Sequence, residues 1–130
     1  MKIAVSSTKN SIESQPSPFF GRCDYFIILD IENNEIKNTK AIKNDAVMQP
    51  GGAGVMSAQT MGNEKVDAVI SNSFGPRAFD ILSQLNIKKY KSKGKTVKED
   101  AELFIKGELE ELKSPGMMGV AKGRFRRGFN

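Results

Sequence analysis

The sequence contains no histidine and only one cysteine, Cys23. A zinc site built from histidine and cysteine, a Ser-His-Asp triad and a Cys-His dyad each require an imidazole or several thiolates in one place. One thiol also forms neither an internal disulfide nor a Cys-x-x-Cys metal site. These absences exclude the common zinc sites and most hydrolase chemistry.

Long apolar runs are missing as well. No run approaches the roughly 20 residues that a membrane-spanning helix requires. The first five residues, MKIAV, lead directly into a polar stretch over residues 6–9, so they lack the apolar core of a secretion signal. We therefore expect a cytoplasmic protein without a membrane partner.

The charge of the chain is unevenly distributed. Apolar residues make up 38% and charged residues 27% of the 130 residues, a composition typical of one globular domain. All 15 acidic residues lie at or before Glu111, and the charges of residues 1–112 cancel. The net charge of +5 therefore resides in residues 113–130.

We predict a folded domain over residues 1–112 and a flexible basic Gly/Arg tail over residues 113–130. Four glycines in the tail disfavour both helix and strand. Basic tails attract anions, which makes its arginines candidate ligand-binding residues. These arginines are Arg124, Arg126 and Arg127. The alternative is a solubilising tail without a specific ligand.

The apolar pattern predicts an α/β fold. Short runs rich in β-branched and aromatic residues predict about five strands, at residues 2–6, 25–31, 36–43, 66–70 and 87–91. Three helices are expected: from the glycine-rich loop to about residue 61, from Pro76 with Phe79, Leu82 and Leu85 on one face, and from Thr96 to about residue 112. The order β-β-β-α-β-α-β-α describes a mixed sheet with helices on its faces, which resembles the ribonuclease H-like fold.

The stretch MQPGGAGVMSAQ, residues 48–59, is a glycine-rich loop that leads into a helix. Free backbone N–H groups and the positive end of the helix dipole suit an anion, and Gly51, Gly52 and Gly54 allow a ligand to come close. The spacing fits neither a P-loop nor a dinucleotide fingerprint, since it lacks the Gly-Lys-Ser/Thr end and the third glycine. The alternative is close packing of the helix on the sheet through small residues.

A second loop of this kind, SNSFGP at residues 71–76, also connects a strand to a helix. In open α/β sheets such loops gather at one edge and form a crevice. Asn72 and Gly75 are therefore candidates to surround the same anionic ligand, although each loop alone is an ordinary strand-to-helix turn.

The stretch FFGRCDYF, residues 19–26, contributes two further candidates. Arg22 supplies a permanent cation. We expect it to help ionise Cys23, the only thiol and a soft metal ligand. The alternative is that Cys23 is a small buried apolar residue.

Four motifs together resemble the dinitrogenase iron-molybdenum cofactor binding family, which includes NifX-like and NafY-like cluster carriers and the C-terminal domain of NifB-like proteins. The motifs are FGRCDYF (20–26), GGAGVMSAQ (51–59), VDAVISNSFGPRAF (66–79) and LNIKKY (85–90). The resemblance covers roughly residues 1–105 and implies the same ribonuclease H-like fold.

The resemblance implies non-catalytic binding, carrying or storage of an anionic iron-sulfur or iron-molybdenum-sulfur cluster. It implies a cluster donor or acceptor protein as a partner. Many relatives have a histidine just before the FG of the first motif, where this chain has Phe19. Cys23 is then the only strong protein ligand for iron. One thiolate cannot saturate a cluster that normally takes four, so the cluster must be held largely by charge and backbone N–H groups or be shared between copies of the chain in a homo-oligomer.

Two other functions remain open from the residues alone. The tail and the lysine cluster over residues 88–98 indicate an alternative function, in which the protein is a module that binds single-stranded nucleic acid or another protein. Catalysis of the ribonuclease H type requires metal-binding carboxylates, the first on the opening strand, and residues 2–6 have none. We therefore expect a protein that is not an enzyme.

Overall fold

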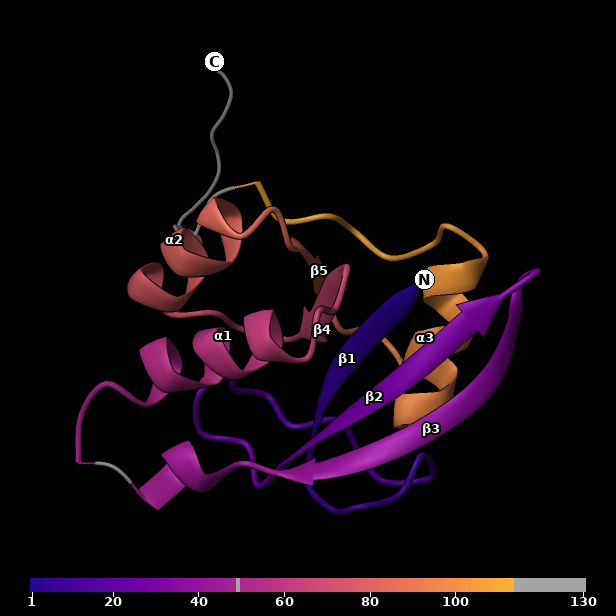
Figure 1. Ribbon diagram of the computed structural model, residues 1–130. Coiled ribbons are helices and arrows are strands. Elements are labelled where there is room, and N and C mark those ends of the chain that lie inside the picture. Colours follow the sequence, from indigo (N-terminus) through magenta and orange to yellow (C-terminus); the bar gives the residue numbers. More distant parts are fainter. Residues whose placement is uncertain (49, 114–130) are drawn as a thin grey trace.

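The computed structural model describes residues 1–48 and 50–113, which fold into a five-stranded sheet with helices on both faces (Figure 1). The strands lie in the order β3-β2-β1-β4-β5. Their bounds are β1 (Lys2–Ser7), β2 (Tyr25–Glu32), β3 (Glu35–Lys43), β4 (Ala68–Ser71) and β5 (Lys88–Lys91). The helices are α1 (Ala53–Asn63), α2 (Pro76–Gln84) and α3 (Val97–Ile105), and a 3-10 turn η1 (Asp45–Met48) follows β3. The α/β fold, its mixed sheet and its element order confirm the prediction.

The sheet is antiparallel on one side and parallel on the other. β1 pairs antiparallel with β2, and β2 pairs antiparallel with β3. A tight turn connects β2 to β3 at Asn33 and Asn34, whose φ angles are 53° and 63°. Asparagine tolerates this left-handed conformation better than most residues. β1, β4 and β5 run parallel, so their carboxyl ends lie at one edge of the sheet. The loops that follow these ends form the pockets described below.

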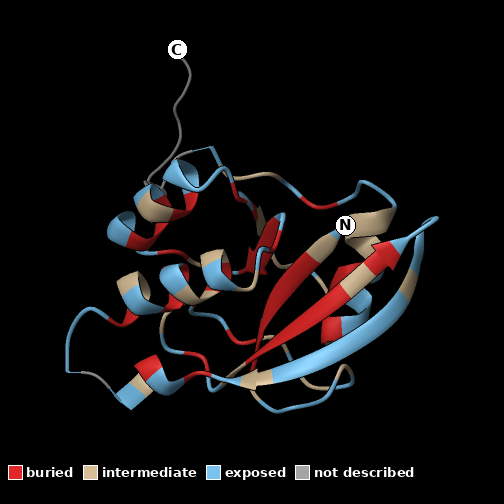
Figure 2. Cartoon of the chain, in the orientation of Figure 1, coloured by how far each residue is buried: buried red, intermediate tan, exposed pale blue. Residues whose placement is uncertain are grey.

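Two hydrophobic clusters lie on opposite faces of the sheet. Side chains alternate along β1, so that Ala4 faces α1 and α2 while Ile3 and Val5 face α3. Figure 2 shows that β1 is mainly buried whereas the edge strand β3 is mainly exposed. The core therefore sits between the central strands and the helices.

The last helix is shorter than predicted. α3 ends at Ile105, and Gly107 adopts a left-handed φ of 74° that the sequence pattern did not reveal. The chain then runs beside β5, where the N–H of Leu112 donates to Lys89 O at 2.7 Å and the N–H of Lys91 donates to Glu110 O at 2.9 Å. The acidic run after Gly107 thus covers the outer edge of β5 instead of extending the helix.

Leu85 does not share the buried face of Phe79 and Leu82, contrary to the expectation from their spacing. Leu85 is the residue that ends α2 and is 45% exposed, instead of lying on the inner face of that helix. Its side chain covers Gly62, where a Cβ atom would lie only 2.9 Å from Leu85 Cδ1. The turn at the helix end carries Leu85 over α1 and away from the sheet.

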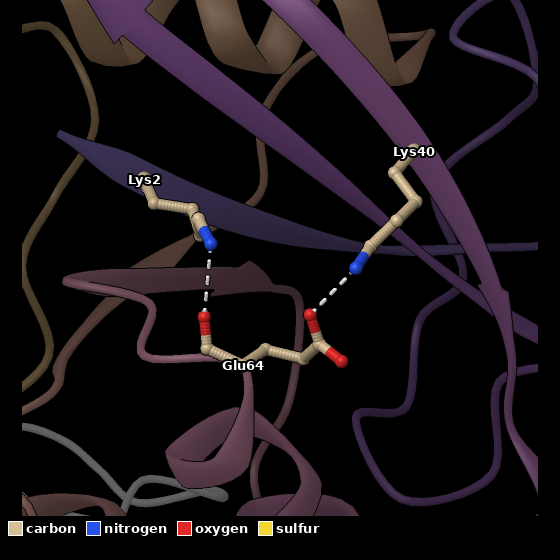
Figure 3. A network of polar contacts seen from close by, with 3 residues as sticks. All are labelled: Lys2, Lys40 and Glu64. Atoms are coloured by element: carbon tan, nitrogen blue, oxygen red, sulfur yellow. Dashed lines mark hydrogen bonds and ion pairs between the residues drawn. The ribbon is translucent and has the colours of Figure 1, made fainter.

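A polar network joins the end of α1 to two strands (Figure 3). Lys40 Nζ lies 2.9 Å from Glu64 Oε1, and Lys2 Nζ donates to the carbonyl oxygen of Glu64 at 3.2 Å. Glu64 is the residue that caps the C-terminus of α1. These contacts tie α1 to β1 and β3 at the end opposite to the cleft described next. Among residues 1–48 and 50–113, no helix is long and apolar enough to cross a bilayer.

Candidate functional site

A cleft of about 410 Å³ opens between the N-termini of α1 and α2, and we call it the arginine cleft. It is lined by residues 19–22 of the loop after β1, residues 52–55 at the start of α1, and Ser73 with residues 75–78 at the start of α2. The two loops predicted to meet at one sheet edge therefore do so, and the loop before β2 forms the third wall.

Buried aromatic residues hold these loops in place. Phe20 is 1% exposed, and its ring centroid lies 5.2 Å from that of Phe26 and 5.3 Å from that of Phe74. The N–H of Phe20 donates to Ser73 O at 3.0 Å, which joins the two loops through their backbones. The neighbours of each anchored phenylalanine are thereby positioned along the cleft.

α1 begins without a side-chain cap. Its N-cap residue, Gly52, has a left-handed conformation with φ of 76°, and no side chain accepts a hydrogen bond from the first turn. The first turn of any helix leaves its N–H groups without partners inside the helix. Here these groups belong to Ala53, Gly54 and Val55, which line the cleft.

α2 begins in the same manner. Gly75 is the N-cap residue, Pro76 follows, and no side-chain cap is present. By contrast, the N-terminus of α3 is fully occupied by the protein. Thr96 Oγ1 accepts from Glu99 N, which is one half of the predicted capping box, whereas the Glu99 carboxylate accepts from Lys95 N instead of Thr96 N. The N–H groups of Val97 and Lys98 donate to the carbonyls of Ser14 and Ile12. The two helices that face the cleft, and not the third, therefore present free N–H groups to a ligand.

The cleft carries positive charge and no negative side chain. Two exposed arginines, Arg22 and Arg77, lie on its wall, and no aspartate or glutamate is among its lining residues in the described part of the chain. Arg22 Nη1 also donates to Val47 O at 3.4 Å, which positions the guanidinium beside the loop that leads into α1. Two guanidinium groups and two helix N-termini together favour an anion.

The glycines of the predicted loop have distinct roles. A Cβ atom at Gly54 would lie 3.2 Å from Ala78 Cβ, so Gly54 allows α1 and α2 to pack closely, and the residue also lines the cleft. Gly52 provides the left-handed turn, and Gly51 is exposed with nothing nearby. The packing interpretation of this loop therefore holds at Gly54, the anion-binding one stays a prediction, and Gly51 lies outside the cleft lining.

Sequence reasoning missed Asn44, which links the loop before β2 to α1 through hydrogen bonds. Its side chain is buried and donates to the carbonyls of Cys23 at 2.8 Å and Gly21 at 3.3 Å. It accepts from Ser57 Oγ and from Ala46 N, both at 3.2 Å. No local pattern indicates this role, because the bonded groups are brought together only by the fold.

The expected ionisation of Cys23 is wrong. The residue is 1% exposed, lies in the core cluster beneath α1 and α2, and its thiol donates to Phe20 O at 3.2 Å. Burial raises the pKa of the Cys23 thiol to about 12, and Arg22 does not offset this effect. A protonated, buried thiol that does not line the cleft is poorly placed to bind metal, so we correct Cys23 from candidate ligand to core residue.

The other predicted site residues do not all lie in one site. Arg22, Gly52, Gly54 and Gly75 meet in the arginine cleft, whereas Asn72 lines a different pocket. The tail arginines at 124, 126 and 127 lie outside the described residues. Phe19, Ser73 and Arg77 were missed; Arg77 directly follows Gly75-Pro76, so the start of the helix was the signal that pointed to it. Within residues 1–48 and 50–113, no group of three or more acidic or cysteine side chains could hold a metal ion.

The family is decided by a sequence profile. The profile described as dinitrogenase iron-molybdenum cofactor matches residues 1–107. The chain belongs to this family. Its curated relatives include the protein MJ0580 of Methanocaldococcus jannaschii, which is 40% identical over 112 residues, a stretch that covers 86% of this chain and 92% of the relative.

Solved structures share the fold. The apo form of the orange protein from Desulfovibrio gigas superposes with a TM-score of 0.80 at 24% identity, covering 88% of this chain and 95% of the other. The Thermotoga protein TM1290 gives a TM-score of 0.77 at 30% identity, covering 91% and 98%. These likenesses agree with the mixed five-stranded sheet and its three helices.

Proposed function

We propose that this protein binds and carries an anionic iron-sulfur or iron-molybdenum-sulfur cluster as cargo in the arginine cleft, without catalysing a reaction on it. The observation that carries the proposal is the convergence of two uncapped helix N-termini, α1 and α2, on one cleft that also holds Arg22 and Arg77. Membership of the dinitrogenase iron-molybdenum cofactor family supports the same class of ligand.

The donor set decides how such a cluster would be held. Thiolates bind the iron of most clusters, usually four of them. No cysteine, aspartate or glutamate lines the cleft in the described part of the chain, and the chain has no histidine. The residues therefore fit a cluster whose metals are already saturated by sulfide or other small ligands. Such a cluster would be held through its negative charge and through hydrogen bonds to its outer sulfur atoms.

Weak, non-covalent holding suits a carrier. Charge-assisted hydrogen bonds each contribute roughly 1.5–3 kcal/mol, so several of them retain a cluster without replacing its ligands. A partner that offers thiolates would then take the cargo by ligand substitution. We accordingly propose a cluster donor or acceptor protein as the partner, and we propose residues 113–130 as a basic tail that attracts the cluster.

Anaerobic reconstitution with iron and sulfide, with and without molybdate, tests the proposal. The samples are the full chain, the Arg22→Gln/Arg77→Gln variant, and a matched Lys43→Gln/Lys88→Gln variant that removes the same charge from exposed strand positions. Metal and sulfide are measured after gel filtration, and circular dichroism checks the fold. We expect the arginine variant to lose at least about tenfold in loading, because two charge-assisted contacts are removed, while the lysine variant retains it.

A chain that ends at Leu112 separates the body from the tail. Equal loading of the shortened and full chains places the cargo in the folded body, as proposed. Loading that disappears with the tail while the arginine variant still loads would contradict the arginine cleft as the site. Absence of loading in every sample would contradict the proposed function.

A further inference from the structure

A second pocket, of about 510 Å³, lies at the carboxyl edge of the parallel strands, and we call it the polar pocket. It is lined by residues 15–18 from the loop after β1, by Asn72 after β4, and by residues 92–95 after β5. Ligands of open α/β sheets bind at this edge, and the volume falls in the range of about 300–1,000 Å³ that small-molecule sites occupy. The pocket is therefore the right size and in the right place for a small ligand.

The lining of the polar pocket favours a negative group. Lys93 and Lys95 flank Gly94 on one wall, and Asn72 adds an amide. No acidic side chain is among the lining residues in the described part of the chain. Two carboxylates, Asp100 and Glu99, contact the loop over residues 93–95, and both accept hydrogen bonds from the backbone N–H groups of that loop.

A buried hydroxyl group is the second observation. Ser17 lines the pocket and is only 6% exposed. Its backbone bonds to Ser6, yet its hydroxyl has no hydrogen-bond partner among residues 1–48 and 50–113. A buried polar group without a partner costs about 1–3 kcal/mol, and native proteins keep few of them. A ligand oxygen in the pocket would satisfy this group.

Hydrogen bonds hold one wall of the polar pocket, the loop over residues 92–95, in place before any ligand arrives. The side chain of Asp100 is fully buried and accepts from Ser92 Oγ, Lys93 N and Gly94 N at 2.5, 2.9 and 2.7 Å. A Cβ atom at Gly94 would lie 2.9 Å from the backbone N of Asp100, so the loop packs directly on the first turn of α3. A preorganised loop lowers the entropy cost of binding.

We propose that the polar pocket binds a small ligand with a tetrahedral dianionic group, either a free oxyanion or a phosphomonoester. Lys93 and Lys95 neutralise the charge, and Ser17 and Asn72 donate to its oxygens. This site is separate from the arginine cleft: Asn72 and Pro18 line the polar pocket, while their neighbours Ser73 and Phe19 pair through an isolated bridge and line the cleft. The proposal therefore stands whether or not a cluster binds.

Titration of the full chain by two-dimensional amide NMR tests the proposal. The probes are inorganic phosphate and molybdate as free oxyanions, and glycerol 3-phosphate and ribose 5-phosphate as phosphomonoesters. We expect shifts at Asn72 and residues 92–95, and smaller ones at Gly54 and Gly75. Tighter binding of the phosphomonoesters identifies a metabolite as the source, and equal binding identifies the free oxyanion. No saturable shift at residues 92–95 with any probe up to about 10 mM would overturn the proposal.

Two variants separate binding from folding. Lys93→Gln/Lys95→Gln should weaken binding at least about tenfold, whereas Lys43→Gln/Lys88→Gln should leave it unchanged. Ser17→Ala should weaken binding severalfold while the melting temperature stays equal or rises, because the variant removes a hydroxyl that lacks a partner. Unchanged binding in both pocket variants would show that the shifts arise elsewhere and would overturn the site.

Discussion

Gly21 lies against the backbone of Gly54, so that a Cβ atom at Gly21 would sit 2.8 Å from both Cα and N of Gly54. This contact brings the loop after β1 onto the first turn of α1, with no side chain between them. The contact thereby fixes the distance between two walls of the arginine cleft, the loop after β1 and the start of α1, at that of touching backbones. Any side chain at this position must push the two walls apart.

Gly21→Ala should therefore destabilise the protein and open the cleft. Overpacking against backbone atoms that cannot move aside costs about 1–3 kcal/mol. Urea unfolding measures the change, and cluster loading at a temperature where the variant is folded measures the effect on the site. Gly51→Ala is the matched control, since a Cβ atom there meets nothing within 4 Å and its φ is not positive. A Gly21→Ala variant as stable as Gly51→Ala would contradict this account of the wall.

Asn44→Ala should be the most destabilising change of a polar residue around the cleft. It leaves the carbonyl of Cys23, the N–H of Ala46 and the hydroxyl of Ser57 without their side-chain partner in a buried region. Each unsatisfied buried group costs about 1–3 kcal/mol, and relaxation offsets part of the sum, so we expect a loss of about 2–4 kcal/mol. Asn38→Ala, on the exposed strand β3, should change the unfolding free energy by less than about 0.5 kcal/mol.

Much of the fold was predictable because the strands are short, strongly apolar runs. The run YFIILDIE became β2 with nearly the expected bounds, and the predicted cap residue Thr96 set the start of α3. The end of α3 was not predictable from helix propensity. Glu108 to Leu112 contains good helix formers, but the left-handed Gly107 stops the helix and β5 offers an unpaired edge. Tertiary pairing overrode a local preference.

The site was partly predictable for a related reason. The rule that loops gather at the carboxyl edge of parallel strands correctly predicted that the two glycine loops lie close together. It did not assign Asn72 to the correct pocket, because the bridge between Phe19 and Ser73 divides that edge in two. The presence of Arg22 next to Cys23 in the sequence also did not indicate the protonation state of the Cys23 thiol. Burial of a thiol depends on the helices packed over it, which local sequence does not show.

The buried thiol of Cys23 should make stability depend on alkaline pH. Its pKa is raised from 9.0 in an exposed thiol to about 12 in the folded protein. Above pH 9 the unfolded chain loses this proton and the folded protein keeps it, so the stability present below pH 9 falls as the pH rises toward 12. The slope from this group is about 1.4 kcal/mol per pH unit. Unfolding of the protein and of Cys23→Ala, measured from pH 8 to about pH 11, isolates the contribution.

The same burial should make Cys23 unreactive. A thiol-specific reagent at pH 8 should label it only as fast as the protein opens, and rapidly in urea. Cluster loading of Cys23→Ala should match that of the unsubstituted chain, provided that the variant is folded. Fast labelling of the folded protein, or loss of loading in Cys23→Ala, would return the thiol to the list of ligands.

Asp100 offers a test of how the polar pocket is built. Asp100→Ala removes three hydrogen bonds to the loop over residues 92–95 and should cost about 2–4 kcal/mol. Asp100→Asn should cost less, about 1 kcal/mol, because the remaining oxygen still accepts from Lys93 and Gly94 and the hydroxyl of Ser92 can reverse to accept from the new amide. Glu102→Ala, exposed on α3, serves as the control. Urea unfolding gives the stability of each variant, and amide hydrogen exchange at Lys93 and Gly94 reports the loop itself. Equal losses in the alanine and asparagine variants would mean that the charge, and not the hydrogen-bond geometry, holds the loop in place.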